Sequence, residues 1–156
     1  MRRYWLYKCN QAGGPAGYFG DWEADVFCTS AEKQWGGSYS TLAHEVWKRL
    51  DDDVAGGDVV VAYQTDLRAV IGFCVVTRMT GPAGRRNILL KPVERLTSPF
   101  AIHEHKRGTL LEGSHAVNGM VMLRELGRPE METLLQLTGC PQRILEGSAI
   151  SGGYRP

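Results

Sequence analysis

The side chains in this sequence best suited to chemistry are aromatic rings next to small residues. Trp35 is followed by Gly36 and Gly37, and then by Ser38 and Tyr39. A glycine lets the backbone come close to a neighbouring group, and the face of an indole attracts another flat ring. The stretch therefore predicts one wall of a pocket for a planar ligand, with the Trp35 indole open at its mouth. Packing of the same indole in the core is an equally good interpretation.

Polar groups that could line such a pocket stand at the ends of two expected strands. They are Cys9 and Asn10 after the first strand, and Tyr63, Gln64 and Thr65 at the end of the second. Aromatic rings stack on the face of an extruded nucleobase, while amide and backbone groups bond to its edge. We therefore expect these residues to bind a planar ligand together with Trp35.

Catalytic chemistry has less support. The sequence contains no motif of a serine hydrolase, a phosphate-binding loop, a zinc protease or a dinucleotide-binding fold. Cys9 or His115 could serve a small hydrolase or a metal-dependent nuclease, and His103 and His105 are further donors. Zinc, however, needs three or four ligands at a recognisable spacing. We expect no catalysis, no metal and no other cofactor, and the enzyme is kept as the alternative.

Charge is balanced overall but unevenly distributed along the chain. The net charge is +1, yet residues 68–107 carry eight Lys or Arg against two Asp or Glu. Such a segment is typical either of a surface that binds nucleic acid, phosphate or acidic protein, or of an ordinary solvated face. Four dispersed cysteines, the absence of a signal peptide and the lack of a long apolar run favour a cytoplasmic protein.

The elements that position these candidates are short strands and few helices. Runs of β-branched and aromatic residues predict strands over 3–9, 57–64, 69–79, 87–96 and 119–126. Helical spacing of apolar residues predicts helices over 40–50 and 128–138. Two helices are too few for a doubly wound sheet, so we expect a mixed α/β fold with a curled sheet or small open barrel. We expect one domain, 1–156, with its core in 3–138 and a loose C-terminal tail.

Four of these segments follow the order found in the EVE domain family of the PUA-like superfamily, which the chain resembles over about residues 3–138. They are YWLYKCN (4–10), QWGG (34–37), GDVVVAYQT with VIGFCVVTRM (57–65 and 70–79), and EGSHAVNGMVMLRELGRPEMETLLQL (112–137). The resemblance implies a PUA-like pseudo-barrel of about five to six strands with two to three short helices.

The resemblance also implies a non-catalytic reader of methylated or hydroxymethylated bases, such as 5-methylcytosine, in DNA or RNA, with DNA favoured. It implies a link to restriction of modified DNA through an effector nuclease partner. The base-binding residues that it implies are Cys9, Asn10, Trp35, Gly36, Ser38, Tyr39, Tyr63, Gln64, Thr65, Ser114 and His115. The phosphate contacts that it implies are Arg85, Arg86, Lys106 and Arg107. An RNA-binding module of the same fold stays open as a further alternative.

Overall fold

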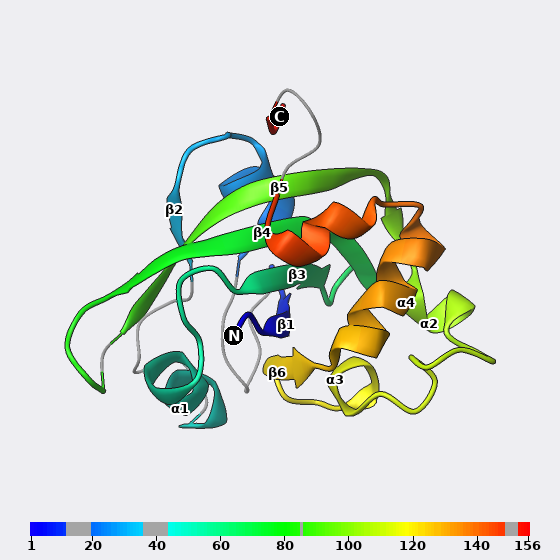
Figure 1. Cartoon of the computed structure of the whole chain (residues 1–156), viewed down its shortest axis with the longest axis horizontal. Coiled ribbons are helices and arrows are strands. Elements are labelled where there is room, and N and C mark those ends of the chain that lie inside the picture. Colours follow the sequence, from blue (N-terminus) through cyan, green and yellow to red (C-terminus); the bar gives the residue numbers. More distant parts are fainter. Residues whose placement is uncertain (12–19, 36–43, 85, 149–152) are drawn as a thin grey trace.

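The computed structural model describes residues 1–11, 20–35, 44–84, 86–148 and 153–156, and its elements are shown in Figure 1. The strands are β1 (Tyr4–Cys9), β2 (Lys33–Trp35), β3 (Val59–Gln64), β4 (Ala69–Thr80), β5 (Asn87–Phe100) and β6 (Leu123–Leu126). The helices are η1 (Glu23–Phe27), α1 (His44–Asp52), α2 (Ile102–His105), α3 (His115–Asn118), α4 (Arg128–Thr138) and η3 (Gln142–Glu146). Within the described part of the chain, no helix is long and apolar enough to cross a membrane.

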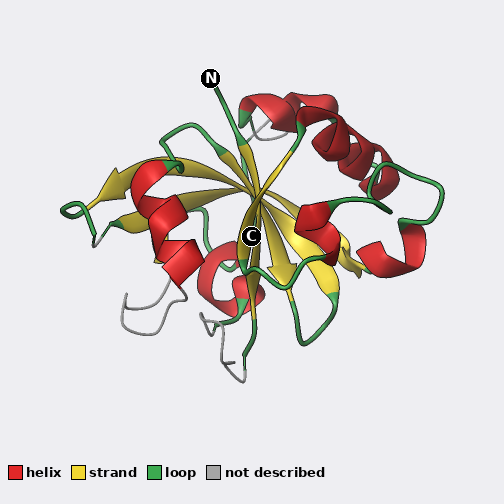
Figure 2. Ribbon diagram, turned by 90° about the horizontal axis from the view of Figure 1, so that it is seen from below, coloured by secondary structure: helices red, strands yellow, loops and turns green. Residues whose placement is uncertain are grey.

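All six strands form one mixed sheet in the order β2-β5-β4-β3-β1-β6. β1 and β3 are parallel, and the other neighbours are antiparallel. β4 and β5 form a long hairpin, and its register shifts near Pro92, a residue that cannot donate a hydrogen bond to the neighbouring strand. The strands twist strongly around each other, and helices lie on both sides of them (Figure 2). The mixed α/β curled sheet expected from the sequence is therefore confirmed.

Several short elements differ from the prediction: β2 and η1, and also α3 and η3, which lie outside the predicted helices. Trp35 is expected in a loop, yet it ends β2, which pairs with β5 through Trp35 and Ile88. Residues 23–27, expected in a loop, form η1 with Val26 and Phe27 buried. These corrections concern segments of five residues or fewer, for which hydrophobic periodicity gives little signal.

The strand alternation divides the core into two hydrophobic clusters on opposite faces of the sheet. On β3, Val60 and Ala62 belong to one cluster, which we call the tryptophan face because it contains Trp5, Trp22 and Trp35. Val59, Val61 and Tyr63 belong to the other, which we call the α4 face because α4 covers it with Met131, Leu134 and Leu135. The period of two in a strand produces this division, and the sequence predicts it for β3.

The closing helix α4 is capped at both ends. Glu130 Oε1 accepts a hydrogen bond of 3.1 Å from the backbone N–H of Gly127, which satisfies a donor at the helix start. Pro129 lies in the first turn, and Gly139 ends the helix in the left-handed conformation with φ of 73°. The helix is thereby held against the sheet at both ends, and its apolar side covers the α4 face.

Candidate binding site

The tryptophan face contains a pair of stacked indoles, of which the sequence singles out Trp35. The rings of Trp22 and Trp35 have centroids 4.0 Å apart and an interplanar angle of 26°. The edge of Tyr7 meets Trp22 with centroids 5.9 Å apart. Trp22 Nε1 also donates a hydrogen bond of 3.2 Å to the carbonyl of Tyr63. The indole of Trp22 is therefore a flat ring stacked on one aromatic side chain and bonded through its edge to a strand backbone.

A buried amide, Gln64, is bonded to the backbone of Trp22. Gln64 is 1% exposed, and its Oε1 accepts a hydrogen bond of 3.0 Å from the backbone N–H of Trp22. Its Nε2 donates to the carbonyl of Gly20 at 2.9 Å and to Asp66 Oδ1 at 2.7 Å. An amide with both its oxygen and its nitrogen bonded in this way is held in one orientation. Both N–H donors of this amide are used within the protein, so Gln64 fixes the backbone of Trp22 against the end of β3.

The parallel pairing of β1 and β3 brings the predicted residues at the two strand ends together. Cys9 is the register partner of Gln64, and its Sγ lies 3.5 Å from Gln64 Oε1. The backbone N–H of Thr65 donates to the carbonyl of Cys9 at 2.8 Å, and the carbonyl of Asn10 accepts from Gly20 at 3.0 Å. Cys9, Asn10, Gln64 and Thr65 therefore lie close together at one end of the sheet.

The prediction that the Trp35 indole lies open is wrong in this structure. Trp35 is 2% exposed, and Trp22 covers its face. The physical reason is that pairing of β2 with β5 turns Trp35 toward the tryptophan face, where another large apolar ring is available to bury it. Trp22, which the sequence indicates as a core residue, is fully buried.

The expectation that Tyr63 forms a second wall of the Trp35 pocket is also corrected. Its side chain belongs to the α4 face, whereas Trp35 belongs to the tryptophan face. Only the backbone carbonyl of Tyr63 reaches Trp22. Because successive side chains of a strand point to opposite sides, Gln64 and Tyr63 cannot both line one pocket with their side chains.

Ser114 and His115 lie at the start of α3, among residues of the α4 face rather than of the tryptophan face. Ser114 is buried and caps α3, because its Oγ accepts a hydrogen bond of 3.3 Å from the N–H of Val117. His115 is exposed. The structure does not bring either side chain to the stacked indoles. Gly36, Ser38, Tyr39 and Arg85, also named by the resemblance, lie outside the described residues.

The remaining phosphate candidates do not form one track. Arg86 precedes β5, where its backbone N–H donates to Asp51 Oδ1 at 3.4 Å. Lys106 and Arg107 follow α2, beyond the other end of β5. Lys106 Nζ lies 3.0 Å from His103 Nδ1 and also donates to Asn118 Oδ1. Arg86 and Lys106 are therefore separated by the whole length of the strand.

Charges of opposite sign surround the two sides of the strand ends. Burial, followed by the carboxylates of Asp66 and Asp21, raises the pKa of the Cys9 thiol on the tryptophan face. On the α4 face, burial followed by the cations Arg124 and Lys106 lowers the pKa of Lys8. The acidic side suits the amino edge of a base, and the basic side suits an anion.

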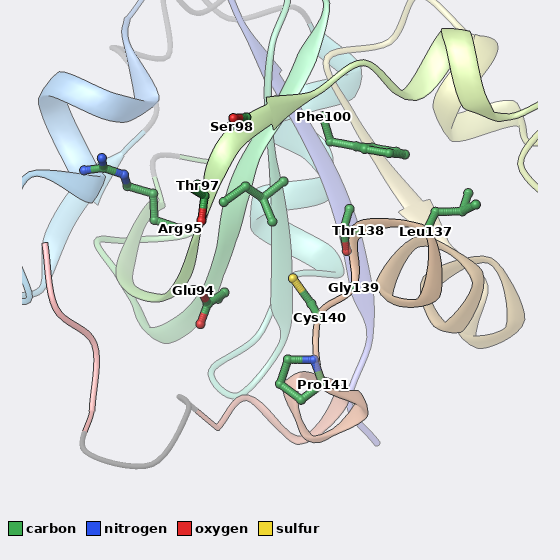
Figure 3. Close-up of a pocket in the computed structure, with 11 residues that line it drawn as sticks. Glu94, Arg95, Thr97, Ser98, Phe100, Leu137, Thr138, Gly139, Cys140 and Pro141 are labelled. Carbon is green, nitrogen blue, oxygen red and sulfur yellow. The ribbon is translucent and has the colours of Figure 1, made fainter.

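A separate cavity of about 340 Å³ opens between the second half of β5 and the end of α4 (Figure 3). Glu94, Arg95 and Phe100 line it from the strand, and Thr138 and Cys140 from the helix end. Burial raises the pKa of both the Cys140 thiol and the Glu94 carboxyl. None of the residues predicted to bind a ligand lines this cavity.

The hydrolase alternative requires a reactive thiol or an activated histidine. Burial raises the pKa of Cys9, so its sulfur is a protonated thiol and a poor nucleophile at neutral pH. Among the residues described, no group of three or more His, Cys, Asp or Glu side chains is placed to hold a metal ion.

A six-stranded curled sheet with few helices defines a mixed α/β fold of the PUA-like pseudo-barrel type. Solved structures share it. A protein of Agrobacterium tumefaciens matches with a TM-score of 0.71 and 16% identity, over 96% of this chain and 99% of its own. Human THYN1 in complex with DNA containing 5-methylcytosine matches with a TM-score of 0.61 and 11% identity, over 89% and 99%. The DUF55 domain of human thymocyte nuclear protein 1 matches with a TM-score of 0.62 and 12% identity, over 88% and 99%.

These likenesses concern the fold, because every identity just given is below one fifth. No protein-family model matches the chain, and no curated protein does.

Proposed function

We propose that this protein is a non-catalytic reader of nucleic acid of the EVE type, which accepts a methylated or hydroxymethylated base, with DNA as the preferred polymer. The fold shared with human THYN1 bound to DNA containing 5-methylcytosine supports the proposal. The order of EVE-like segments along the sequence supports it independently. An effector nuclease that acts on the recognised DNA stays a prediction.

The observation that carries the proposal is the arrangement around the Trp22 indole. This flat ring with an N–H on its edge stacks on Trp35 and bonds to a strand carbonyl, and the Gln64 amide bonds to the backbone of the same residue, Trp22. A nucleobase is also a flat ring with donors on its edge, and readers hold such a base by stacking and edge hydrogen bonds. We place the base on the Trp35 face that Trp22 covers, next to the Gln64 amide.

Binding in this position requires the Trp22 indole to move, because Trp22 is fully buried and Trp35 is 2% exposed. Part of the binding free energy is then used to displace one stacked ring by another. Burial of an added methyl group contributes about 0.8 kcal/mol, or about fourfold in affinity. We therefore expect weak overall affinity with a measurable preference for the modified base.

The test compares two oligonucleotides of identical sequence, one with and one without 5-methylcytosine, titrated into the protein at one salt concentration. We expect the modified strand to bind about fourfold more tightly and tryptophan fluorescence to change as the stacked pair separates. Hydroxymethylcytosine and N6-methyladenine oligonucleotides form further arms, and RNA of the same sequence tests the RNA-binding alternative. Equal affinity for every modified and plain strand would overturn the proposal.

Two variants examine the position of the base. Trp22→Ala removes the ring that covers Trp35, so folded protein should bind the modified strand more tightly than the wild type. Val26→Ala is the matched control, because Val26 is also fully buried in the same segment but is an aliphatic side chain outside the aromatic stack. Thermal melting establishes that each variant is folded. Should Trp22→Ala prevent folding, the oligonucleotide comparison on the wild type still decides.

A further inference from the structure

A group of cations surrounds the ring of Tyr63 on the α4 face. Lys8 Nζ lies 5.8 Å from the centre of the Tyr63 ring, and the His103 ring meets it edge-on with centroids 6.1 Å apart. Lys106 Nζ lies 3.0 Å from His103 Nδ1. Arg68, in the turn after β3, is close enough to influence the pKa of both Tyr63 and His103. We call Lys8, Arg68, His103 and Lys106 the cation cluster.

The cluster carries charge that no carboxylate offsets in the described part of the chain. The ion pairs found there join Arg3 to Asp53, Arg78 to Glu32, Arg95 to Glu23 and Arg128 to Glu132, and none includes a member of the cluster. Like charges held together without a counter-charge repel each other and attract an anion.

Lys8 is the most unusual member because it is only 8% exposed, and burial lowers the pKa of its ammonium group. Its Nζ donates to the carbonyls of Gly119 at 2.6 Å and Val117 at 3.4 Å. An ammonium group has three donors, and burying one is unfavourable unless its charge is compensated. Two carbonyl oxygens satisfy hydrogen bonds but supply only partial charge, so an external anion would complete the compensation.

Arg68 provides an independent observation from the backbone. Its φ is 52°, and no other non-glycine residue in the described part of the chain has a positive φ. The left-handed conformation is unfavourable for a residue with a Cβ, and glycine is the residue normally found at such a turn position. Its side chain is exposed, and its charge lowers the pKa of both Tyr63 and His103. A long cation kept at a position better suited to glycine indicates a use for the side chain.

We propose that the cation cluster binds a phosphodiester group of nucleic acid, with Arg68 and Lys106 in contact with its oxygens and Lys8 providing charge from below. The proposal rests on the proposed function for the identity of the polymer. It replaces the phosphate track expected from the sequence and keeps only Lys106 from it. Because Tyr63 and Gln64 are successive residues, the anion site and the base site lie on the two sides of one strand end.

His103 makes this site sensitive to pH. Burial, followed by Lys106, Arg68 and Lys8, lowers the pKa of the imidazole. Tyr63 from β3 also faces it, and Glu104 and His105 are its neighbours on α2. A bound phosphate favours the imidazolium and raises the pKa again, so binding takes up a proton. Affinity should therefore rise as the pH falls from neutral into the acidic range.

The first experiment titrates a plain single-stranded oligonucleotide into wild type, Arg68→Gly and Lys106→Met at several salt concentrations. Loss of one charged contact should weaken binding about tenfold, and should lower the slope of log K against log salt by about 0.7. Arg68→Gly should melt no lower than wild type, since glycine suits the positive φ. Lys48→Gln, an exposed lysine of α1 on the other side of the sheet, is the matched control. Unchanged affinity and slope in both cluster variants would overturn the proposal.

A second experiment follows the His103 ring by NMR over a pH series, with and without inorganic phosphate and then the same oligonucleotide. Both probes should raise the pKa of His103, and the oligonucleotide should do so at lower concentration. An effect of phosphate alone, or of neither probe, would contradict a nucleic-acid site. The cluster variants should bind the modified and the plain strand more weakly by the same factor, so that the ratio of the two affinities stays as in the wild type. Equal affinity of the wild type for modified and plain strands would overturn base reading but would leave the anion site standing.

Discussion

Single side chains decide what the strand ends can bind, and Gln64 shows this most directly. Its oxygen accepts from the Trp22 backbone, and its nitrogen donates to Gly20 and Asp66. Any replacement has to provide both a donor and an acceptor at a position that is 1% exposed. The residue is therefore at once a structural support for Trp22 and the polar group nearest to the proposed base.

Gln64→Glu should make stability depend on pH. The carboxylate would face the carbonyl of Gly20 and the carboxylate of Asp66, where the amide nitrogen now donates. Burial and Asp66 would raise the pKa of the new Glu above its unfolded value of about 4.3. The free energy of unfolding of the variant should then be close to that of the wild type below the unfolded pKa. It should fall by about 3 kcal/mol as the pH rises through the folded pKa.

Urea unfolding of both proteins at pH 4 and pH 8 measures this effect. Gln34→Glu, at an exposed position on β2, is the control and should show little difference at either pH. A difference between Gln64→Glu and wild type that is the same at both pH values would contradict the argument.

Elements are joined to each other by a few buried polar groups, of which Asp58 is the clearest. Asp58 precedes β3 and is 2% exposed. Its carboxylate accepts hydrogen bonds of 3.0 Å from the backbone N–H of Arg3, from Trp5 Nε1 and from the backbone N–H of Ala55. These bonds fix the start of β1 against the start of β3, and this parallel pairing determines that Cys9 and Gln64 meet at the other end.

Asp58→Ala should lower the free energy of unfolding by about 3 kcal/mol, because it leaves buried donors without an acceptor. Asp53→Ala removes a nearby carboxylate whose ion pair with Arg3 is exposed to solvent, and should cost at most about 1 kcal/mol. Chemical denaturation of the two variants gives the comparison. Similar losses in both would show that the Asp58 bonds do not hold the two strands.

The whole molecule is a curled sheet with a different layer on each side, and the two layers supply different chemistry. The tryptophan face offers stacked rings, a fixed amide and nearby carboxylates, whereas the α4 face offers cations around Tyr63. A nucleotide that spans the ends of β1 and β3 could present its base to one side and its phosphate to the other. Strand alternation within one sheet is sufficient to produce this separation.

Close approach of η1 to the sheet maintains the layer that holds Trp22, and Gly72 of β4 permits it. A Cβ at this position would lie 2.3 Å from the carbonyl oxygen of Glu94 and 2.8 Å from two atoms of the Phe27 ring. Gly72→Ala should therefore destabilise the protein by about 3 kcal/mol and displace η1. Thermal melting and the fluorescence of the stacked tryptophans measure the two effects.

Gly113→Ala is the control for this prediction, since a Cβ there meets no atom within 4 Å. It should change stability by at most about 0.5 kcal/mol. Wild-type stability and fluorescence in Gly72→Ala would show that the sheet and η1 adjust to the added methyl group.

The sequence by itself determined the strands β1, β3, β4, β5 and β6, the helix α4 and the two faces of β3. These features depend on local propensity and on periods of two or 3.6 residues, which a single chain segment displays. It also placed Cys9 and Asn10 at the end of one strand and Gln64 and Thr65 at the end of another, because strand ends are visible in composition.

Only the tertiary structure decided that Trp35 is covered by Trp22, that Tyr63 faces away from both, and that Lys8 lies near His103, 95 positions along the chain. These relations are set by which strands pair and in which register, and pairing is a property of distant segments that no local pattern records. Local periodicity indicates that a side chain will be buried, and only the packed fold determines which ring or charge it meets.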